Sequence, residues 1–218
     1  MRAMILAAGR GERLRPLTDT LPKPLVPVAG QPLITYHLRH LAEIGIHEVV
    51  INCAWLAPLL METLGDGSRF GVNIQYSVEA EALETGGGIK QALPFLGTEP
   101  FLVINGDIYI DQLPSLPELA DNRLAHLWLV DNPPHHPQGD FVLAGNTLQA
   151  GGDDKLTFSG IGIYRPQLFS AITEQRFALG PLLKAQIAAG RVSGEHWRKY
   201  WCDVGTMERL QALEQRLA

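Results

Sequence analysis

Residues 4–18 read MILAAGRGERLRPLT, and this stretch indicates how the chain begins to fold. Its first four residues are an apolar run of the kind that forms a buried strand, and Gly9 and Gly11 follow at once. Apolar side chains then recur at helical spacing between Pro32 and Gly45. Proline is common at the start of a helix, and glycine is common just beyond its end. A strand, a glycine-containing loop and a helix in this order predict an α/β fold.

The same alternation continues along the first half of the chain. Apolar strand patterns occupy residues 48–52, 72–76 and 101–105, and helical patterns occupy residues 55–64 and 87–93. Short, continuously apolar strands that alternate with helices are typical of a parallel sheet covered on both faces. The predicted fold class is therefore α/β, with a Rossmann-like, open, mostly parallel sheet flanked by helices.

After residue 107 the pattern becomes that of a mixed sheet. Strands are expected at 124–130, 158–164 and 199–204, and a hairpin at 140–149, where Gly145-Asn146 separates two short strands. Helices are expected at 166–172 and 181–189, and Thr206 is a suitable N-cap for a last helix that ends at residue 217. Because the chain has no internal repeat and no linker, we expect a single domain over residues 1–218.

The composition limits the functions that the chain can have. Its 218 residues are 46% hydrophobic, which is enough for one sizeable core. Basic residues number 18 and acidic residues 23, for a net charge of −5, which disfavours nucleic acid or an anionic membrane as a partner. The first apolar run is too short for a membrane span and lacks the layout of a signal peptide, so the expected location is the cytoplasm. Two cysteines, Cys53 and Cys202, do not make a disulfide scaffold, and nothing in the sequence indicates an oligomeric state.

The glycine-containing loop has the chemistry of a phosphate-binding site, with a solvated basic turn as the alternative. Gly9 and Gly11 let backbone N–H groups approach an anion, and Arg10, Arg13 and Arg15 add guanidinium groups that suit phosphate oxygens. The third glycine of the dinucleotide-binding motif is missing after Gly9 and Gly11, and the pattern G-x-x-x-x-G-K-[ST] does not occur. We therefore expect a phosphate loop of another design, which disfavours an oxidoreductase that binds a nicotinamide or flavin.

The segment LAAGRGERLRPLT at residues 6–18, followed by PKPLVPV at 22–28, resembles the signature of the sugar-1-phosphate nucleotidylyltransferases. Members of this family have the nucleotide-diphospho-sugar transferase fold, and they join a nucleoside triphosphate to a sugar 1-phosphate with release of pyrophosphate. The resemblance implies a nucleotide-binding half at about 1–110 and a sugar-binding half at about 111–218. The nucleotide-binding residues that it implies in these segments and at the end of a later strand are Ala8, Gly9, Gly11, Glu12, Arg13, Lys23 and Asn105, with Arg13 and Lys23 as catalytic residues. Lys23 lies between two prolines in a loop and is not expected to belong to the core.

Residues 79–88, EAEALETGGG, resemble the nucleobase-binding segment of the same family. The resemblance assigns Glu79 to the edge of the base, and Glu84, Thr85 and Gly86 to a turn whose backbone faces the base. Glu84 stands where the family usually has a glycine, so the geometry of this turn is open. The alternative is a plain helix N-terminus with Thr85 as the N-cap.

Two aspartates resemble the metal ligands of the family. Asp107 follows an apolar strand in the sequence Asn105-Gly106-Asp107, and Asp203 belongs to WCDVGT at residues 201–206, which resembles the motif W-x-D-x-G-T. Two carboxylates, with phosphate oxygens and water, meet the preference of Mg²⁺ for oxygen ligands. The resemblance therefore implies Mg²⁺ as the cofactor; without it, Asp203 would be read as a helix-capping or surface residue.

The second half also contains segments that resemble a sugar pocket. They supply the expected sugar-binding residues Gly139, Asp140, Ser159 and Gly160, although Asp140 could equally be a strand-edge residue. His135 and His136 have no Cys or His partner at ligand spacing, so we expect them in an exposed loop.

Within the family, the whole-chain pattern most resembles the members that transfer a uridylyl group from UTP to N-acetylmuramic acid 1-phosphate, a reaction of cell-wall recycling. The absence of a bulky aromatic residue between Glu79 and Phe95 also favours UTP over a purine nucleotide. Guanylyl transfer to mannose 1-phosphate and thymidylyl transfer to glucose 1-phosphate are the alternatives. The alternative of another class is a non-catalytic regulatory homologue, which would be expected to lack Arg13, Lys23 or one of the two aspartates.

Overall fold

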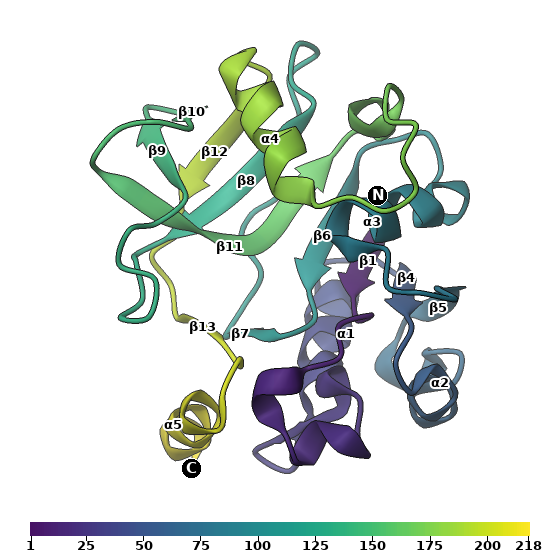
Figure 1. Cartoon of the computed structure of the whole chain (residues 1–218). Helices are drawn as coiled ribbons and strands as arrows, with labels where there is room; N and C mark the ends of the chain where they lie inside the picture. Colours follow the sequence, from purple (N-terminus) through teal and green to yellow (C-terminus); the bar gives the residue numbers. More distant parts are fainter.

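The structure is a computed structural model that describes residues 1–218, and its centre is one mixed sheet of nine strands (Figure 1). In the order in which they lie side by side, the strands are β5 (Asn73–Val78), β4 (Glu48–Cys53), β1 (Ala3–Leu6), β6 (Phe101–Asn105), β11 (Lys155–Tyr164), β8 (Ala125–Val130), β12 (Val192–His196), β10 (Thr147–Gln149) and β9 (Phe141–Ala144). The first four strands are parallel, and β11 and β10 run antiparallel to their neighbours. The α/β fold class with a mostly parallel mixed sheet is thus confirmed.

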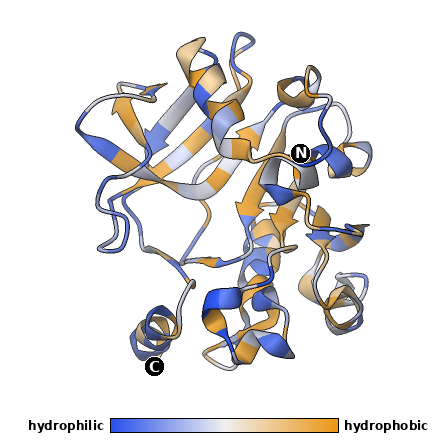
Figure 2. Ribbon diagram, viewed as in Figure 1, coloured by the Kyte–Doolittle hydropathy of each residue, from blue (hydrophilic) through white to orange (hydrophobic).

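Helices cover both faces of this sheet. Apolar side chains of α1 (Leu33–Glu43) and α2 (Ala57–Leu64) pack on one face in a cluster of 26 buried residues. Those of α3 (Glu84–Leu96) and α4 (Leu179–Ala188) pack on the other face in a cluster of 19. The strands around β1 and β6 are accordingly coloured mostly hydrophobic in Figure 2. No helix combines the length and the apolar character that crossing a bilayer requires.

A smaller part of the chain packs beside the sheet. The C-terminal helix α5 (Met207–Leu217) buries Leu210 and Leu213 in a third cluster of eight residues. Two short ladders support this region, β2 (Pro27–Val28) with β3 (Gln31–Pro32) and β7 (Ile108–Ile110) with β13 (Trp201–Asp203). Thr206 is the N-cap of α5, as expected, with its hydroxyl oxygen accepting from the backbone N–H of Arg209 at 3.4 Å.

Three expectations about the elements are corrected. The helix expected at 166–172 is only the 3₁₀ turn Pro166–Phe169. The helix expected at 87–93 extends from 84 to 96, because its glycines pack against neighbouring backbone instead of breaking it. Strand β12 was not expected, because Ser193, Gly194 and Glu195 interrupt its apolar pattern although it lies between β8 and β10.

Candidate active site

A cleft of about 580 Å³ lies where β1, β4, β5 and β6 end. In an open α/β sheet this is the edge where ligands bind, next to the point where the strand order reverses. The expected nucleotide-binding residues that line the cleft are Ala8, Gly9, Gly11, Glu12, Arg13, Lys23, Glu79, Glu84, Thr85 and Asn105. Asp107 lines it as well. Segments far apart in the sequence therefore form one site.

The loop after β1 is held in a defined shape. Gly11 has φ +68°, a left-handed conformation, and a Cβ on it would lie 3.1 Å from the Cβ of Lys23. The Thr18 hydroxyl donates to the Gly11 carbonyl at 2.8 Å, and Leu14 is fully buried in the third cluster. The loop is therefore anchored at Gly11 and Leu14, and Gly9, Gly11 and Arg13 are among its residues that line the cleft.

Only one of the three loop arginines lines the cleft. Arg10 lies over the ring of Trp55, with its guanidinium carbon 4.4 Å from the ring centre. Arg15 pairs with Asp19 at 3.1 Å on the surface. Arg13 is therefore the loop arginine that is placed to contact a phosphate.

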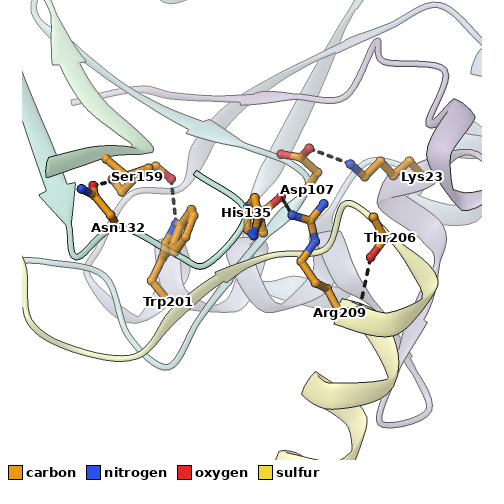
Figure 3. A network of polar contacts seen from close by, with 10 residues as sticks. Lys23, Asp107, Asn132, His135, Ser159, Trp201, Thr206 and Arg209 are labelled. Carbon is orange, nitrogen blue, oxygen red and sulfur yellow. Dashed lines mark hydrogen bonds and ion pairs between the residues drawn. The ribbon is translucent and has the colours of Figure 1, made fainter. Parts of the chain in front are cut away.

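Lys23 is buried, contrary to the expectation from its proline-flanked loop. It is 9% exposed, and its Nζ donates to Asp107 Oδ2 at 2.6 Å. The 3₁₀ turn Lys23–Leu25 holds it against Gly11, and Figure 3 shows its side chain directed at that of Asp107. A cation and a carboxylate thus meet at one end of the cleft.

Asp203 lies beside this pair because β13 and β7 run antiparallel. Asp203 is opposite Ile108 in the register, and the N–H of Val204 donates to the Asp107 carbonyl at 2.7 Å. Arg209 Nη1 lies 3.2 Å from Asp203 Oδ2, and His135 Nε2 lies 3.0 Å from Oδ1 (Figure 3). The His135 contact is not aligned as a hydrogen bond, so Oδ1 is buried without one.

The two aspartates have the donor chemistry for a divalent ion, although only Asp107 lines the cleft and Asp203 lies just outside it. The carboxylates of Asp107 and Asp203 are hard oxygen donors, and the buried Oδ1 of Asp203 has lone pairs with no hydrogen bond. The chain offers no cluster of three or more His, Cys, Asp or Glu side chains for a metal ion. Further ligands would have to come from phosphate oxygens and water, which is typical of Mg²⁺.

The segment in which the resemblance places nucleobase binding also lines the cleft. Glu84 has φ +61°, the left-handed conformation that glycine adopts most easily, at the position where the family usually has glycine. Glu84, Thr85 and the neighbouring Ala82 line the cleft. Gly86 does not, because it packs against Phe177, whose ring would lie 2.3 Å from a Cβ at this position. The alternative with Thr85 as N-cap is wrong, because the helix begins at Glu84, and Leu83, two residues before Thr85, occupies the cap position.

Sequence reasoning missed several residues that line the cleft, notably Asn52. Asn52 is 3% exposed, receives a hydrogen bond from the Ala7 N–H at 2.9 Å and donates to Glu79 Oε1 at 2.6 Å. An asparagine within an otherwise apolar strand, VVINC, is the signal that could have revealed it. Pro24, Gly106 and Gly205 also line the cleft.

None of the expected sugar-binding residues lines the cleft. The Ser159 hydroxyl donates to the Trp128 carbonyl at 2.7 Å, and the carboxylate of Asp140 accepts from the Phe158 N–H at 2.8 Å. Gly139 has φ +59° and packs against residues 132 and 155. Gly160 is the one next to the cleft, because a Cβ there would lie 2.6 Å from the side-chain amide of Asn105. The side chains of Ser159 and Asp140 thus make internal contacts, and the sugar-binding role of all four residues stays a prediction.

The loop with the two histidines is less isolated than expected. Both side chains are about two-fifths exposed, at 40% for His135 and 41% for His136. His135 nevertheless reaches Asp203, and His136 Nε2 lies 3.2 Å from Asp140 Oδ1. The loop between β8 and β9 therefore connects the expected sugar segment to the expected metal ligands.

Comparison with known proteins gives a consistent picture. The sequence model of the nucleotidyl transferase family matches residues 2–141. The chain is 52% identical over 221 residues to N-acetylmuramate alpha-1-phosphate uridylyltransferase from Neisseria meningitidis, covering 97% of this chain and 96% of that protein. The protein of the same name from Caulobacter vibrioides is 35% identical over 233 residues, covering 99% and 96%.

A solved structure from Bacillus anthracis, described as a glucose-1-phosphate thymidylyltransferase, superposes with a TM-score of 0.84. The match covers 99% of this chain and 94% of that one at 22% identity, so it shows a shared fold.

Proposed function

The chain belongs to the nucleotidyl transferase family, and we propose that it transfers the uridylyl group of UTP to N-acetylmuramic acid 1-phosphate. The products are UDP-N-acetylmuramic acid and pyrophosphate. The observation that carries this proposal is the single cleft that combines the loop at 8–13, Lys23, Asp107 and the turn at 82–85, in a chain similar over its whole length to two uridylyltransferases. We place the nucleotide mainly on residues 1–110 and the sugar on residues 111–218.

The reaction needs positioning and charge neutralisation more than covalent help. An oxygen of the sugar phosphate, largely ionised at neutral pH because its second pKa is about 6, attacks the α-phosphorus of UTP in line. The bond from the α-phosphorus to the β-phosphate oxygen breaks, and pyrophosphate leaves with the electron pair. No general base is required, because the attacking oxygen is already ionised.

The chain supplies the positive charge for this transfer. Arg13 and the backbone N–H groups after β1 hold the β- and γ-phosphates, so that they neutralise the leaving pyrophosphate. Lys23 contacts the phosphates between which the bond forms, from its position between Gly11 and Asp107. Residues 82–85 receive the base, and Asn105 lies between the two ends.

Asp107 and Asp203 would hold the divalent ion, for which we propose Mg²⁺. Such an ion supplies positive charge to the phosphate oxygens and helps to orient them. Arg209 holds Asp203 from the side of α5, so this carboxylate is fixed before any ligand binds. We further propose that the protein acts in the cytoplasm, in the recycling of peptidoglycan.

The test is a comparison of three nucleotides. With N-acetylmuramic acid 1-phosphate as co-substrate, kcat/KM is measured for UTP, dTTP and GTP by pyrophosphate release. Two unpaired polar groups for the wrong base give an expected preference of about 10²-fold for UTP over GTP. dTTP shares the base edge of UTP and should be rejected less strongly. Equal or better use of GTP would contradict the proposal and favour guanylyl transfer to mannose 1-phosphate.

A further inference from the structure

A chain of buried hydrogen bonds connects the two ends of the cleft. The N–H of Ala7, just after β1, donates to Asn52 Oδ1 on β4 at 2.9 Å. Asn52 Nδ2 donates to Glu79 Oε1 at 2.6 Å, and Glu79 Oε2 accepts from the N–H of Leu83 at 3.0 Å. Ala7, Asn52 and Glu79 are each at most 4% exposed. The chain therefore runs from the start of the phosphate loop to the middle of the nucleobase segment.

The direction of every bond in this chain is fixed by chemistry. The N–H groups of Ala7 and Leu83 can only donate, so Asn52 must turn its oxygen to Ala7, and Glu79 must accept with both oxygens. The amide nitrogen of Asn52 then has Glu79 as its partner. A glutamine at 79 or an aspartate at 52 could not satisfy the same chain by itself.

Helix α3 packs directly onto this pair. A Cβ on Gly88 would lie 2.7 Å from Glu79 Oε1 and 2.8 Å from Asn52 Nδ2, so the helix approaches the pair as closely as a residue without a side chain allows. The left-handed Glu84 at the start of the same helix turns the backbone toward the cleft. The position of the nucleobase turn is therefore tied to the pair.

We propose that Asn52 and Glu79 are positioning residues that hold the phosphate loop and the nucleobase turn at a fixed separation, while the backbone of residues 82–85 reads the base. This inference rests on the proposed function, in which one nucleotide spans both ends of the cleft. Both oxygens of Glu79 already accept from the protein, and the residue is 4% exposed, so it has little surface to offer to a base. Ala82, Glu84 and Thr85 line the cleft around the bonded Leu83.

The separation between the phosphate loop and the nucleobase turn matters for transfer, because a nucleotide that binds to both is positioned by both. If the phosphate loop and the nucleobase turn shift relative to one another, the nucleotide cannot make its contacts at both points at once, and its binding weakens. Loss of the pair should therefore weaken the use of UTP and its preference over other nucleotides, while binding of the sugar 1-phosphate, assigned to the other half of the chain, stays unchanged.

The test reverses the direction of the central hydrogen bond. Glu79→Gln places the amide N–H₂ of the introduced glutamine against that of Asn52, so two donors face each other. Asn52→Asp places a carboxylate against that of Glu79. In the double variant Asn52→Asp/Glu79→Gln, the introduced aspartate accepts from Ala7 and from the introduced glutamine, whose oxygen accepts from Leu83. The double variant also keeps one buried negative charge. It should fold even if Asn52→Asp does not.

We expect each single variant to raise the KM for UTP about 10-fold, the scale for an unmade buried hydrogen bond to a charged group. The double variant should return to within about 3-fold of the wild-type KM, and the KM for the sugar 1-phosphate should not move in any of them. If Glu79 reads the base itself, Glu79→Gln changes the nucleotide preference and Asn52→Asp does not restore it, which overturns the proposal. A double variant that folds but stays 10-fold impaired overturns it too.

Two further readouts separate this proposal from simpler explanations. A merely structural pair would lower Tm in the single variants but leave the KM for UTP of the folded protein at the wild-type value, which overturns the positioning role. The measurements use the nucleotide that the wild-type enzyme uses best. If that nucleotide is not UTP, the proposed function fails, whereas recovery in the double variant still decides whether the pair positions the nucleotide.

Discussion

Glu84 is one of three residues with a Cβ whose backbone has a positive φ, together with Ala29 and Leu56. Its φ of +61° lies in the left-handed region, which costs a residue with a Cβ roughly 1 kcal/mol or more. Its side chain offers little in return, because the Arg176 Nε is 3.5 Å away and both side chains are largely exposed. The conformation is therefore held by the surrounding turn.

Glu84→Gly should consequently stabilise the protein slightly, by about 0.5–1 kcal/mol, with nearly unchanged turnover. Glu84→Ala is the matched control, because it removes the carboxylate but retains the Cβ. Tm by calorimetry and kcat/KM for UTP are measured for both. If the two variants lose activity equally, the carboxylate itself contacts the nucleotide and the backbone explanation is wrong.

Lys23 combines a buried stem with a charged end in the cleft. Lys23→Ala should lower the rate at least about 10²-fold, the scale for a lost electrostatic stabiliser, and should also lower stability by about 1–2 kcal/mol because buried side-chain contacts are lost. Lys23→Met retains most of the stem and should recover most of the stability but none of the rate. Assays of pyrophosphate release measure the effect on the rate, and thermal unfolding measures the effect on stability. Near-normal turnover of the methionine variant would remove Lys23 from the catalytic set.

Asp203→Asn tests the metal assignment at the same scale. The substitution keeps the size of the side chain but removes the charge between Arg209 and His135. Turnover should fall at least about 10²-fold, and binding of Mn²⁺, followed by electron paramagnetic resonance without substrate, should weaken about 10-fold or more. Asp111→Asn is the control, since Asp111 pairs with Arg216 on the surface. Unchanged Mn²⁺ binding in the first variant would refute the ligand role.

At the scale of an element, α3 shows why three glycines stand at the start of a helix. A Cβ on Gly87 would lie 2.2 Å from the carbonyl oxygen of Gln175, and one on Gly86 would meet Phe177. The segment 175–177 also bonds to this region, because the N–H of Gly87 donates to the Phe177 carbonyl at 3.1 Å. The glycines therefore admit a neighbouring backbone, which their weak helix propensity would not suggest.

Gly87→Ala should therefore destabilise the protein by about 1–3 kcal/mol, although alanine is the better helix former. Gly180→Ala in α4 is the control, because a Cβ there meets nothing within 4 Å. It should be neutral or stabilising by up to about 1 kcal/mol. Urea unfolding of the two variants gives the comparison. A stable Gly87→Ala protein would mean that the segment at 175–177 can move away freely.

The elements that the sequence predicts well are those whose signal is local. The apolar runs at 101–105 and 48–52 mark β6 and β4 within a residue, because strands buried on both faces are continuously apolar. Strand β12 is not predicted in this way, because Ser193 and Gly194 interrupt its apolar pattern. Its place in the sheet depends on its neighbours β8 and β10, which are distant in the sequence. The start of α3 is not predicted either, because its glycines are tolerated only through contacts with residues 175–177, which are distant in the sequence.

At the scale of the whole molecule, the sequence predicts most of the segments that line the cleft but not how their residues pair. The segments at 8–13, 79–85 and 105–107 are recognised by their likeness to a family. The contact of Lys23 with Asp107 joins residues 84 positions apart, and that of His135 with Asp203 depends on a loop crossing from the other half of the sheet. Such pairings are consequences of topology, and no local pattern encodes them.

The pH dependence of stability is also a property of the whole molecule. His126 on β8 is 8% exposed, and burial lowers its pKa from 6.5 to about 4, with Ser193 Oγ at 3.0 Å from Nδ1. Burial lowers the pKa of His37 in the same way. In the unfolded chain these rings take up protons near pH 6.5, whereas in the folded protein they stay neutral until about pH 4.

Between these two pH values the unfolded state therefore binds more protons than the folded state. The contribution of the neutral rings to the free energy of unfolding is fully present above about pH 6.5. It decreases as the pH falls toward 4, by up to about 3 kcal/mol for each ring. Urea unfolding of the wild-type protein between pH 4 and 7 should show this slope. His126→Asn retains a side-chain amide that can bond to Ser193 but does not titrate, so the slope should decrease by about one proton. If His126→Asn leaves the slope unchanged, the ring is already protonated in the folded protein and the burial argument fails.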